Sequence, residues 1–466
     1  MAELAATAPG MARRPVTLLV RMAMLLALSL AFMARPALAQ QILRDAETEA
    51  LLRDMSRPLI EAAGMQPENV RIVLINDSEI NAFVAGGQIV YIHSGLFTSA
   101  DNANEVQGVI AHELGHVDGG HIIRIHEGVE QATSVMIATL LLGAAAVALG
   151  AGEAGMGIIA AGQQAAIGRF LAFSRVQENS ADQAGARYLA RAGISGRGSL
   201  AFFRRLQNLE YRLSIPQNDG YARTHPLTGE RISRLEATYQ ADPAWEVPTD
   251  PALEERFQRV RAKLAGYVDA PRLVFQRYPE SNRTIPARYA RAYAYHRTGH
   301  PEESMREVDA LLESRPHDPY FLELKGQILL ESGRPREALT ALREAVGIVP
   351  DQPLIAALLG HALISTEDAA NFEEAKRVLR TAIARDNDNP FAWYQLGIVY
   401  DREGDEARAA LATAERYNLI GQPQLALPNA ERAMMGIQVG TPDWLRADDI
   451  ARVSRSAVQQ RGRRNR

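Results

Sequence analysis

The sequence His112-Glu113-Leu114-Gly115-His116 places two imidazoles four positions apart, with a carboxylate directly after the first. Positions i and i+4 share one face of an α-helix, so both rings can bind a single Zn²⁺ ion while Glu113 serves as the general base of a hydrolysis. Apolar residues recur around them at three- and four-residue steps: Val106, Val109, Ile110, Leu114 and Val117. This spacing predicts a helix with a core-facing stripe that holds the two ligands on a rigid element.

A catalytic zinc site needs a third protein ligand, and the best candidate is Glu178. It lies in a stretch of strong helix formers without proline, residues 174–189, in which Glu178 and Asp182 fall on one helix face. In that geometry Glu178 completes a His, His, Glu set, and Asp182 accepts the free N–H of a liganding imidazole. The alternative is a solvated acidic face, because charged residues at this spacing are common on exposed helices.

The motifs HELGH at 112–116 and ENSAD at 178–182 together resemble those of the zinc metallopeptidase superfamily of the CAAX prenyl proteases, HtpX and the periplasmic BepA-type proteases. The resemblance implies one Zn²⁺ per chain, bound by His112, His116 and Glu178. It also implies that Glu113 activates the water and that Asp182 supports a ligand.

A third segment, Thr224-His225-Pro226 followed by Gly229-Glu230-Arg231-Ile232, resembles the THP…ERI segment near these active sites. The resemblance implies that His225 approaches the zinc or stabilises the developing oxyanion, and that Arg231 helps to orient it or binds substrate. The alternative for His225 is a histidine in a surface turn before proline. The other nearby histidines, His93, His121 and His126, are interpreted as structural or solvated, because the ligand set does not need them.

Upstream of the helix, residues 70–75 and 88–92 are rich in β-branched side chains and are separated by turn-forming residues. They are predicted to be strands. Residues 81–84 and 89–96 match the superfamily's strand at the cleft. An exposed edge of this kind binds an extended peptide by adding it as a further strand.

The N-terminus has the features of a signal peptide. Three arginines precede an apolar run at residues 22–33, and Pro36-Ala37-Leu38-Ala39 ends in a cleavage pattern. The run is too short for an anchor helix that crosses a bilayer. Removing residues 1–39 takes away four arginines and one glutamate, so the net charge changes from −4 to −7. An acidic chain without cysteine does not suggest a nucleic-acid binder and has no disulfides, so we expect an exported protein stabilised by packing and by its metal.

Two apolar stretches separate the halves of the zinc site, at residues 134–152 and 154–168. The first is long enough to cross a membrane. A crossing would need the second to return, and that one is shorter, rich in glycine and interrupted by Gln163 and Gln164. We expect a helical hairpin at 134–168 that packs near the active site and touches a membrane or a membrane-protein substrate. The alternative is a pair of spanning helices.

The C-terminal part is a repeat array. Similar segments begin at Ile285, Pro319, Pro353 and Pro390, and small residues recur in register in and between their helices. The pattern resembles the tetratricopeptide repeat, with three extra residues around 366–370 in the third copy and a capping segment at 424–438. Stacked copies form a superhelix whose concave face binds protein. The tail at 441–466 is basic and is predicted to be disordered, with weak attraction to anionic lipids.

The predicted fold class is therefore an α+β zincin-like peptidase domain at 40–270, mainly helical with a small sheet, then a linker at 271–284, then an all-α repeat superhelix at 285–440. The proline-rich stretch 243–281, which serves as the join, is expected to hold one helix. The combination resembles the BepA-type proteases. This implies a periplasmic zinc endopeptidase that degrades misfolded outer-membrane proteins and aids their assembly, with the repeats docking clients or the assembly machinery. Two alternatives are a chaperone or adaptor whose zinc site is closed by His225, and an inner-membrane protease like HtpX. Glu113 argues against the first, and the repeats against the second.

Overall fold

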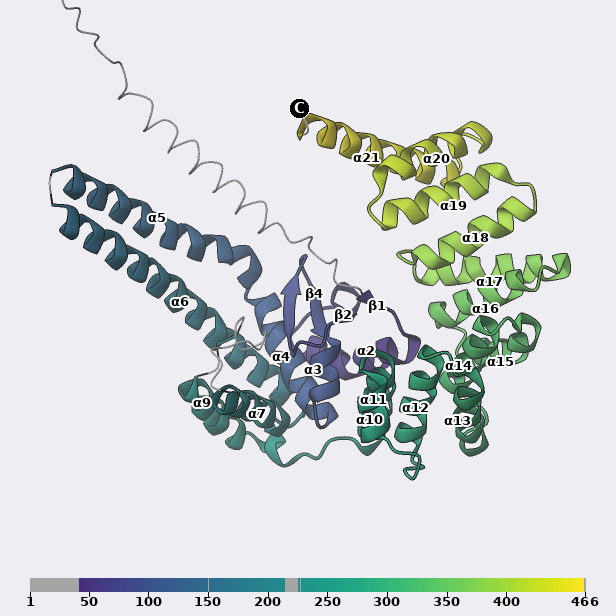
Figure 1. Cartoon of the computed structure of the whole chain (residues 1–466), viewed down its shortest axis with the longest axis horizontal. Coiled ribbons are helices and arrows are strands. Elements are labelled where there is room, and N and C mark those ends of the chain that lie inside the picture. Colours follow the sequence, from purple (N-terminus) through teal and green to yellow (C-terminus); the bar gives the residue numbers. More distant parts are fainter. Residues whose placement is uncertain (1–41, 150, 214–224, 227, 465–466) are drawn as a thin grey trace, which may run out of the picture. The chain divides into compact units, whose positions relative to one another are not determined.

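The computed structural model describes residues 42–149, 151–213, 225–226 and 228–464 (Figure 1). The predicted signal peptide at 1–39 lies outside these residues.

A four-stranded sheet with the order β1-β2-β4-β3 lies in the first part of the chain. Its strands are β1 (Ile42–Leu43), β2 (Arg71–Ile75), β3 (Ala82–Ala85) and β4 (Ile89–His93). β2 and β4 are parallel, while β1 and β3 pair antiparallel with their neighbours and form the two edges. The predicted strands are thus correct to within one residue. Of the two segments expected at the cleft, residues 81–84 fall on the edge strand β3, whereas residues 89–96 form the inner strand β4 and the start of the next helix.

Helix α4 (Ala103–Asp118) carries the HELGH motif through the centre of the peptidase core. It begins where the Asn102 side chain accepts a hydrogen bond from the Glu105 amide, as an N-cap does. Instead of one core-facing stripe, every residue from Ala103 to His116 is buried, because several helices cover it: α2 (Ala46–Ala62), α6 (Gly152–Arg191), α7 (Arg197–Leu213) and α10 (Pro251–Val268). The short α3 (Ser94–Ser99) and α9 (Gly229–Gln240) complete this domain.

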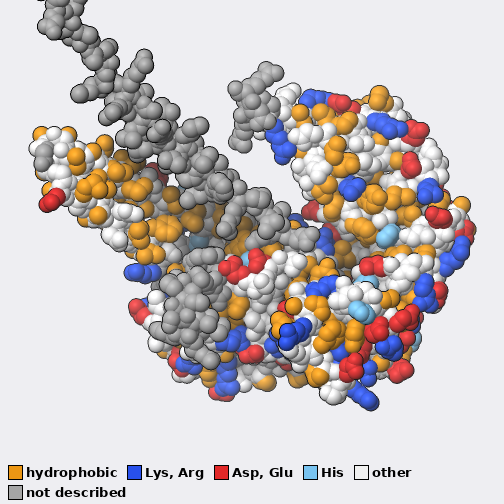
Figure 2. All heavy atoms as spheres, viewed as in Figure 1, with side chains coloured by type: hydrophobic (Ala, Val, Ile, Leu, Met, Phe, Trp, Pro, Cys, Tyr) orange, Lys and Arg blue, Asp and Glu red, His pale blue; other side chains and the backbone are white. Residues whose placement is uncertain are grey.

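Helices α5 (His121–Ala148) and α6 form the predicted hairpin, which is longer than residues 134–168 (Figure 1). Glycines let them approach closely: a Cβ added at Gly143 would lie 2.5 Å from Ile159, and one added at Gly155 would lie 2.5 Å from the Gly143 carbonyl oxygen. Only 6% of the most apolar 18-residue stretch of α5 is buried. Figure 2 shows the resulting apolar surface along both helices. The second half of α6 enters the core and carries Glu178 and Asp182.

Four helical pairs begin at the predicted positions: α12 (Ile285–Arg297) with α13 (Pro301–Ser314), α14 (Pro319–Glu331) with α15 (Pro335–Ile348), α16 (Pro353–Ser365) with α17 (Phe372–Arg385), and α18 (Pro390–Arg402) with α19 (Glu406–Leu419). Gly299, Gly333 and Gly404 turn the chain inside a pair with φ of 75° to 78°, which favours glycine. The extra residues of the third copy form a short 3₁₀ turn, Ala369–Asn371.

Two predictions about the ends of the repeat region are wrong. The join has two helices and not one, since α11 (Pro271–Arg277) follows α10 inside the predicted linker. The tail is not disordered, because α21 (Pro442–Arg464) packs Ala447, Ile450 and Ala451 against α19 and α20 (Pro423–Gly436). The prediction of disorder rested on the basic residues at the end of the sequence and overlooked these apolar residues. With them, α20 and α21 form a fifth helical pair.

A buried ionic cluster connects the peptidase domain to the first repeats. The Glu47 carboxylate on α2 accepts a hydrogen bond of 2.8 Å from the Tyr289 hydroxyl and one of 3.4 Å from Lys263 Nζ. Arg259 on α10 donates both to Glu47 and to Asp318, the N-cap of α14. These groups are paired, as buried charges must be, so the repeats begin as part of the same packed structure.

Candidate metal centre

Two glycines allow α4 and α6 to bring their polar side chains together. A Cβ added at Gly115, the fourth residue of HELGH, would lie 2.6 Å from the Ala181 carbonyl oxygen. One added at Gly185 would lie 3.0 Å from the Ala111 carbonyl group. Real Cβ atoms rarely tolerate such contacts, so the close approach of the two helices depends on both glycines.

The side chains of His112, His116 and Glu178 meet at this crossing and are buried. His112 Nε2 lies 3.1 Å from His116 Nε2 and 3.4 Å from Glu178 Oε2, and His116 Nε2 lies 3.3 Å from Glu178 Oε1. His225, which precedes α9, adds its Nδ1 at 3.3 Å from His112 Nε2 and 3.1 Å from Glu178 Oε1. The three predicted ligands and His225 thus form one cluster.

These separations fit a zinc ion. Ligand atoms that bind one Zn²⁺ tetrahedrally, at about 2.0–2.1 Å, are about 3.3 Å apart. In the five contacts described above, the three imidazole nitrogens and the two Glu178 oxygens are 3.1 to 3.4 Å from their neighbours. Imidazole nitrogen with one carboxylate is also a donor set that zinc prefers. His112, His116 and Glu178 would hold the metal, and His225 Nδ1 lies close enough to them to supply a fourth ligand.

Glu113 lies beside the cluster, and its carboxylate is fully buried. Neither of its oxygens accepts a hydrogen bond from a described residue, although His225 Nε2 is 3.5 Å from Oε1. A buried carboxylate without such a bond is costly and is found where the group serves a reaction. This position suits a general base that takes a proton from a water at the metal.

Asp182 and Arg231 support the ligands from behind. Asp182 Oδ1 lies 3.0 Å from His112 Nδ1, on the far side of that ring from the cluster. Arg231 donates to both Asp182 oxygens, from Nε at 2.7 Å and from Nη2 at 2.8 Å. Its Nη1 lies 3.1 Å from Glu178 Oε2 and donates to the Pro226 carbonyl oxygen at 2.7 Å. Arg231 therefore fixes both acidic side chains and the turn after His225.

The electrostatics of the cluster favour a cation. Burial by itself would raise the pKa of Asp182, but the hydrogen bonds from Arg231 and His112 outweigh it and lower that pKa. Burial likewise opposes ionisation of Glu178, yet His225, His112 and His116 hold its pKa well below the usual value. Both carboxylates therefore stay ionised at neutral pH, which supplies the negative charge that a divalent ion needs in a buried site.

The three histidines that were interpreted as structural or solvated differ from one another. His126 on α5 is exposed. His93 is buried at the end of β4, with Nδ1 3.7 Å from Asp77 Oδ2. His121 is buried beside the metal cluster, with Nδ1 2.9 Å from His116 Nδ1. The Gly119-Gly120 pair before it was the sequence signal for this return.

The first and the C-terminal parts of the chain each match a known protein family. Residues 45–239 match Peptidase family M48, and residues 289–353 and 365–424 match the Tetratricopeptide repeat. A Beta-barrel assembly-enhancing protease of Yersinia pestis is 27% identical over 386 residues, covering 80% of this chain and 76% of that protein. Its namesake in Escherichia coli (strain K12) is 23% identical over 414 residues, covering 87% and 83%. The crystal structure of YrrB, a TPR protein with an unusual peptide-binding site, matches 38% of this chain and 91% of its own with 17% identity and a TM-score of 0.31.

Proposed function

We propose that this chain, a metallopeptidase that combines a peptidase family M48 domain with tetratricopeptide repeats, is a periplasmic zinc endopeptidase in the quality control and assembly of outer-membrane β-barrel proteins. The family predicted from HELGH and ENSAD is confirmed by the M48 match. The names of the relatives support the client class. The observation that carries the activity is the cluster of His112, His116 and Glu178 with the buried Glu113 beside it.

A bound zinc ion would supply a Lewis acid that polarises the scissile carbonyl and makes water more acidic. The chain's own residues do the rest. The open edge of β3 can receive an extended peptide by strand addition. Glu113 takes the proton of the attacking water and can pass it to the leaving amine. Asp182 and Arg231 hold the ligands, and His225 either closes the fourth position or, once displaced, stabilises the oxyanion.

The direct test is cleavage of an unfolded outer-membrane β-barrel protein by the purified, zinc-loaded chain in a single turnover. Glu113→Gln should keep zinc at wild-type stoichiometry while cleavage falls by at least a hundredfold, because the ligands remain and only the base is lost. The matched control is Glu130→Gln, an exposed glutamate on α5 outside the cluster. A Glu113→Gln rate within tenfold of wild type would refute Glu113 as the base.

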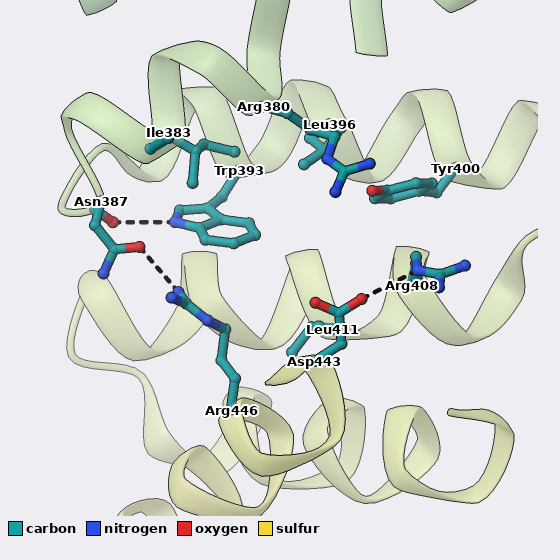
Figure 3. A pocket seen from close by; sticks show the side chains of 11 residues that line it. Arg380, Ile383, Asn387, Trp393, Leu396, Tyr400, Arg408, Leu411, Asp443 and Arg446 are labelled. Atoms are coloured by element: carbon teal, nitrogen blue, oxygen red, sulfur yellow. Dashed lines mark hydrogen bonds and ion pairs between the residues drawn. The ribbon is translucent and has the colours of Figure 1, made fainter. Parts of the chain in front are cut away.

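The repeats are proposed to bind clients or the assembly machinery, and they offer a cavity of about 290 Å³ for a bound side chain (Figure 3). Its walls are partly apolar and aromatic, with Trp393 and Tyr400, and partly cationic. Arg408 pairs with Asp443 and Arg446 donates to Asn387, whereas Arg380 makes no hydrogen bond or ion pair with a described residue. This chemistry suits an aromatic side chain next to a carboxylate.

Arg380→Ala should therefore weaken crosslinking of the client to the repeats, while peptide cleavage by the M48 domain is unchanged. Arg377→Ala is the control, because Arg377 is also exposed on α17 but does not line the cavity. Equal crosslinking by both variants would remove this cavity from recognition.

Contact with a membrane is proposed for the α5–α6 hairpin. Leu140, Leu141 and Leu142 are 45, 68 and 62% exposed, which is unusual for adjacent large apolar residues of a soluble helix. Replacing Leu141 and Leu142 with Glu should abolish flotation of the protein with lipid vesicles in high salt. Leu273→Glu on α11, at a site that is 52% exposed, should not. If wild-type protein floats only in low salt, the contact is electrostatic, and the hairpin is not its cause.

A further inference from the structure

The chain changes direction directly after the HELGH helix. α4 ends at Asp118, α5 begins at His121, and only Gly119 and Gly120 lie between them. Gly120 has a φ of 59°, in the left-handed region that glycine adopts without strain. This turn places the first residue of α5 beside the last turn of α4, so that the ring of His121 lies next to that of His116.

The two rings are in direct polar contact. His121 Nδ1 lies 2.9 Å from His116 Nδ1, the ring centroids are 4.9 Å apart, and both side chains are buried. The other nitrogen of His116, Nε2, faces His112 and Glu178 in the metal cluster. His116 must leave that nitrogen free of a proton to bind a metal, so its proton sits on Nδ1. The contact is then a hydrogen bond from His116 to His121.

The ring of His121 occupies space that a glycine leaves open. A Cβ added at Gly119 would overlap the Nε2, Cδ2 and Cε1 atoms of His121. With Gly120 supplying the turn and Gly119 supplying the room, two adjacent glycines set the position of one ring. The arrangement is therefore built into the fold at this helix junction.

We infer that His121 is a positioning residue for the metal ligand His116. It accepts the Nδ1–H of His116, which fixes the tautomer and turns Nε2 toward the metal. Asp182 makes the equivalent contact with His112, at 3.0 Å from Nδ1, so each ligating imidazole has its own buried acceptor. Loss of such an outer partner typically weakens metal binding 10- to 100-fold. The inference rests on the proposed zinc site and concerns its affinity.

The test compares zinc dissociation constants of full-length variants, measured by competition with a chelator. His121→Leu keeps bulk but removes the acceptor, and we expect it to bind zinc about 10- to 100-fold more weakly than wild type. His121→Asn places an acceptor oxygen close to the position of Nδ1, so it should recover most of the loss. His126→Leu, which changes an exposed histidine on the same helix, should bind zinc as wild type does.

A second pair of variants separates positioning from folding. Gly119→Ala should weaken zinc binding in the wild-type background, because the new methyl group displaces the His121 ring. In a His121→Ala background it should have little further effect, because alanine has none of the ring atoms that the new methyl group would meet. Thermal unfolding with saturating zinc reports whether each variant is folded.

Wild-type affinity in His121→Leu would overturn the inference. So would an Asn variant as weak as the Leu variant, since that result would make packing and not the hydrogen bond responsible. If wild-type protein binds zinc tightly but cleaves no polypeptide, the proposed function fails while these comparisons still decide the role of His121. A wild-type chain that binds no zinc would overturn both.

Discussion

Arg231 donates two hydrogen bonds to Asp182, one to each carboxylate oxygen, of 2.7 and 2.8 Å, and both side chains are buried. Asp182 in turn faces His112 Nδ1 at 3.0 Å. The guanidinium thus acts on the metal cluster through one intermediate carboxylate. It also contacts Glu178 directly. Its positive charge therefore offsets part of the negative charge of both Asp182 and Glu178.

Arg231→Lys should therefore lower zinc affinity by about tenfold or more, since a lysine cannot make the bidentate contact. Arg234→Lys is the control on the same helix, because Arg234 is exposed and pairs with exposed Glu230. Chelator competition measures both. Equal affinity in the two variants would show that the fork geometry is dispensable.

Glu178→Ala should lose the metal itself, in contrast with the loss of rate alone in Glu113→Gln. Removing one of three protein ligands weakens affinity and leaves His112 and His116 without the carboxylate that faces both. Zinc content after dialysis, determined by elemental analysis, distinguishes the two variants. About one zinc per chain in Glu178→Ala would mean that His225 or another group is the true third ligand.

The HELGH and ENSAD motifs located His112, His116 and Glu178, which the structure brings together, because their spacing on helices is a local property. The first residues of the tetratricopeptide repeats could also be predicted from the sequence, since Pro319, Pro353 and Pro390 lie in the first turn of their helices. His121 was not accessible in this way, because its contact with His116 depends on a turn at two glycines and not on a helical period. The tail was misjudged for a related reason: the packing of Ala447 and Ile450 on α20 depends on tertiary contacts that a basic composition does not show.

Glu323 should make stability depend on pH. Burial and the negative charges of Asp45 and Glu47 raise its pKa to about 8, although the positive charge of Lys263 acts to lower it. Between pH 4.5 and 8 the unfolded chain releases a proton that the folded chain keeps, so this carboxyl lowers stability as pH rises. Glu323→Gln should therefore gain in relative stability from pH 5 to pH 8, as measured by urea unfolding. Glu313→Gln, an exposed site on α13, should show no such trend.

Truncation should show that the peptidase domain needs the first repeats but not the last. A chain that ends at residue 284 loses Tyr289 and Asp318, which pair with Glu47 and Arg259, and leaves buried charges without partners. It should unfold at a lower temperature than full-length protein. A chain that ends at Ile348 keeps these pairs and should retain stability, zinc and cleavage of a generic peptide, while client capture falls. Equal melting temperatures for the two truncations would show that the ionic cluster adds nothing.

His225 should act as a gate on the metal centre. Its Nδ1 lies 3.1 Å from Glu178 Oε1 and 3.3 Å from His112 Nε2, where a fourth ligand belongs, and its Nε2 faces Glu113. A ring in this position keeps water from the site, so basal proteolysis should be low until a substrate displaces it. His225→Ala should raise basal cleavage if blocking is its main role, and lower it if the ring mainly stabilises the oxyanion after displacement. Cleavage rates with zinc saturating in both proteins separate the two roles. An unchanged rate, together with a distance well beyond about 2.1 Å between the ring and zinc in a crystal of the loaded protein, would return His225 to a purely structural role.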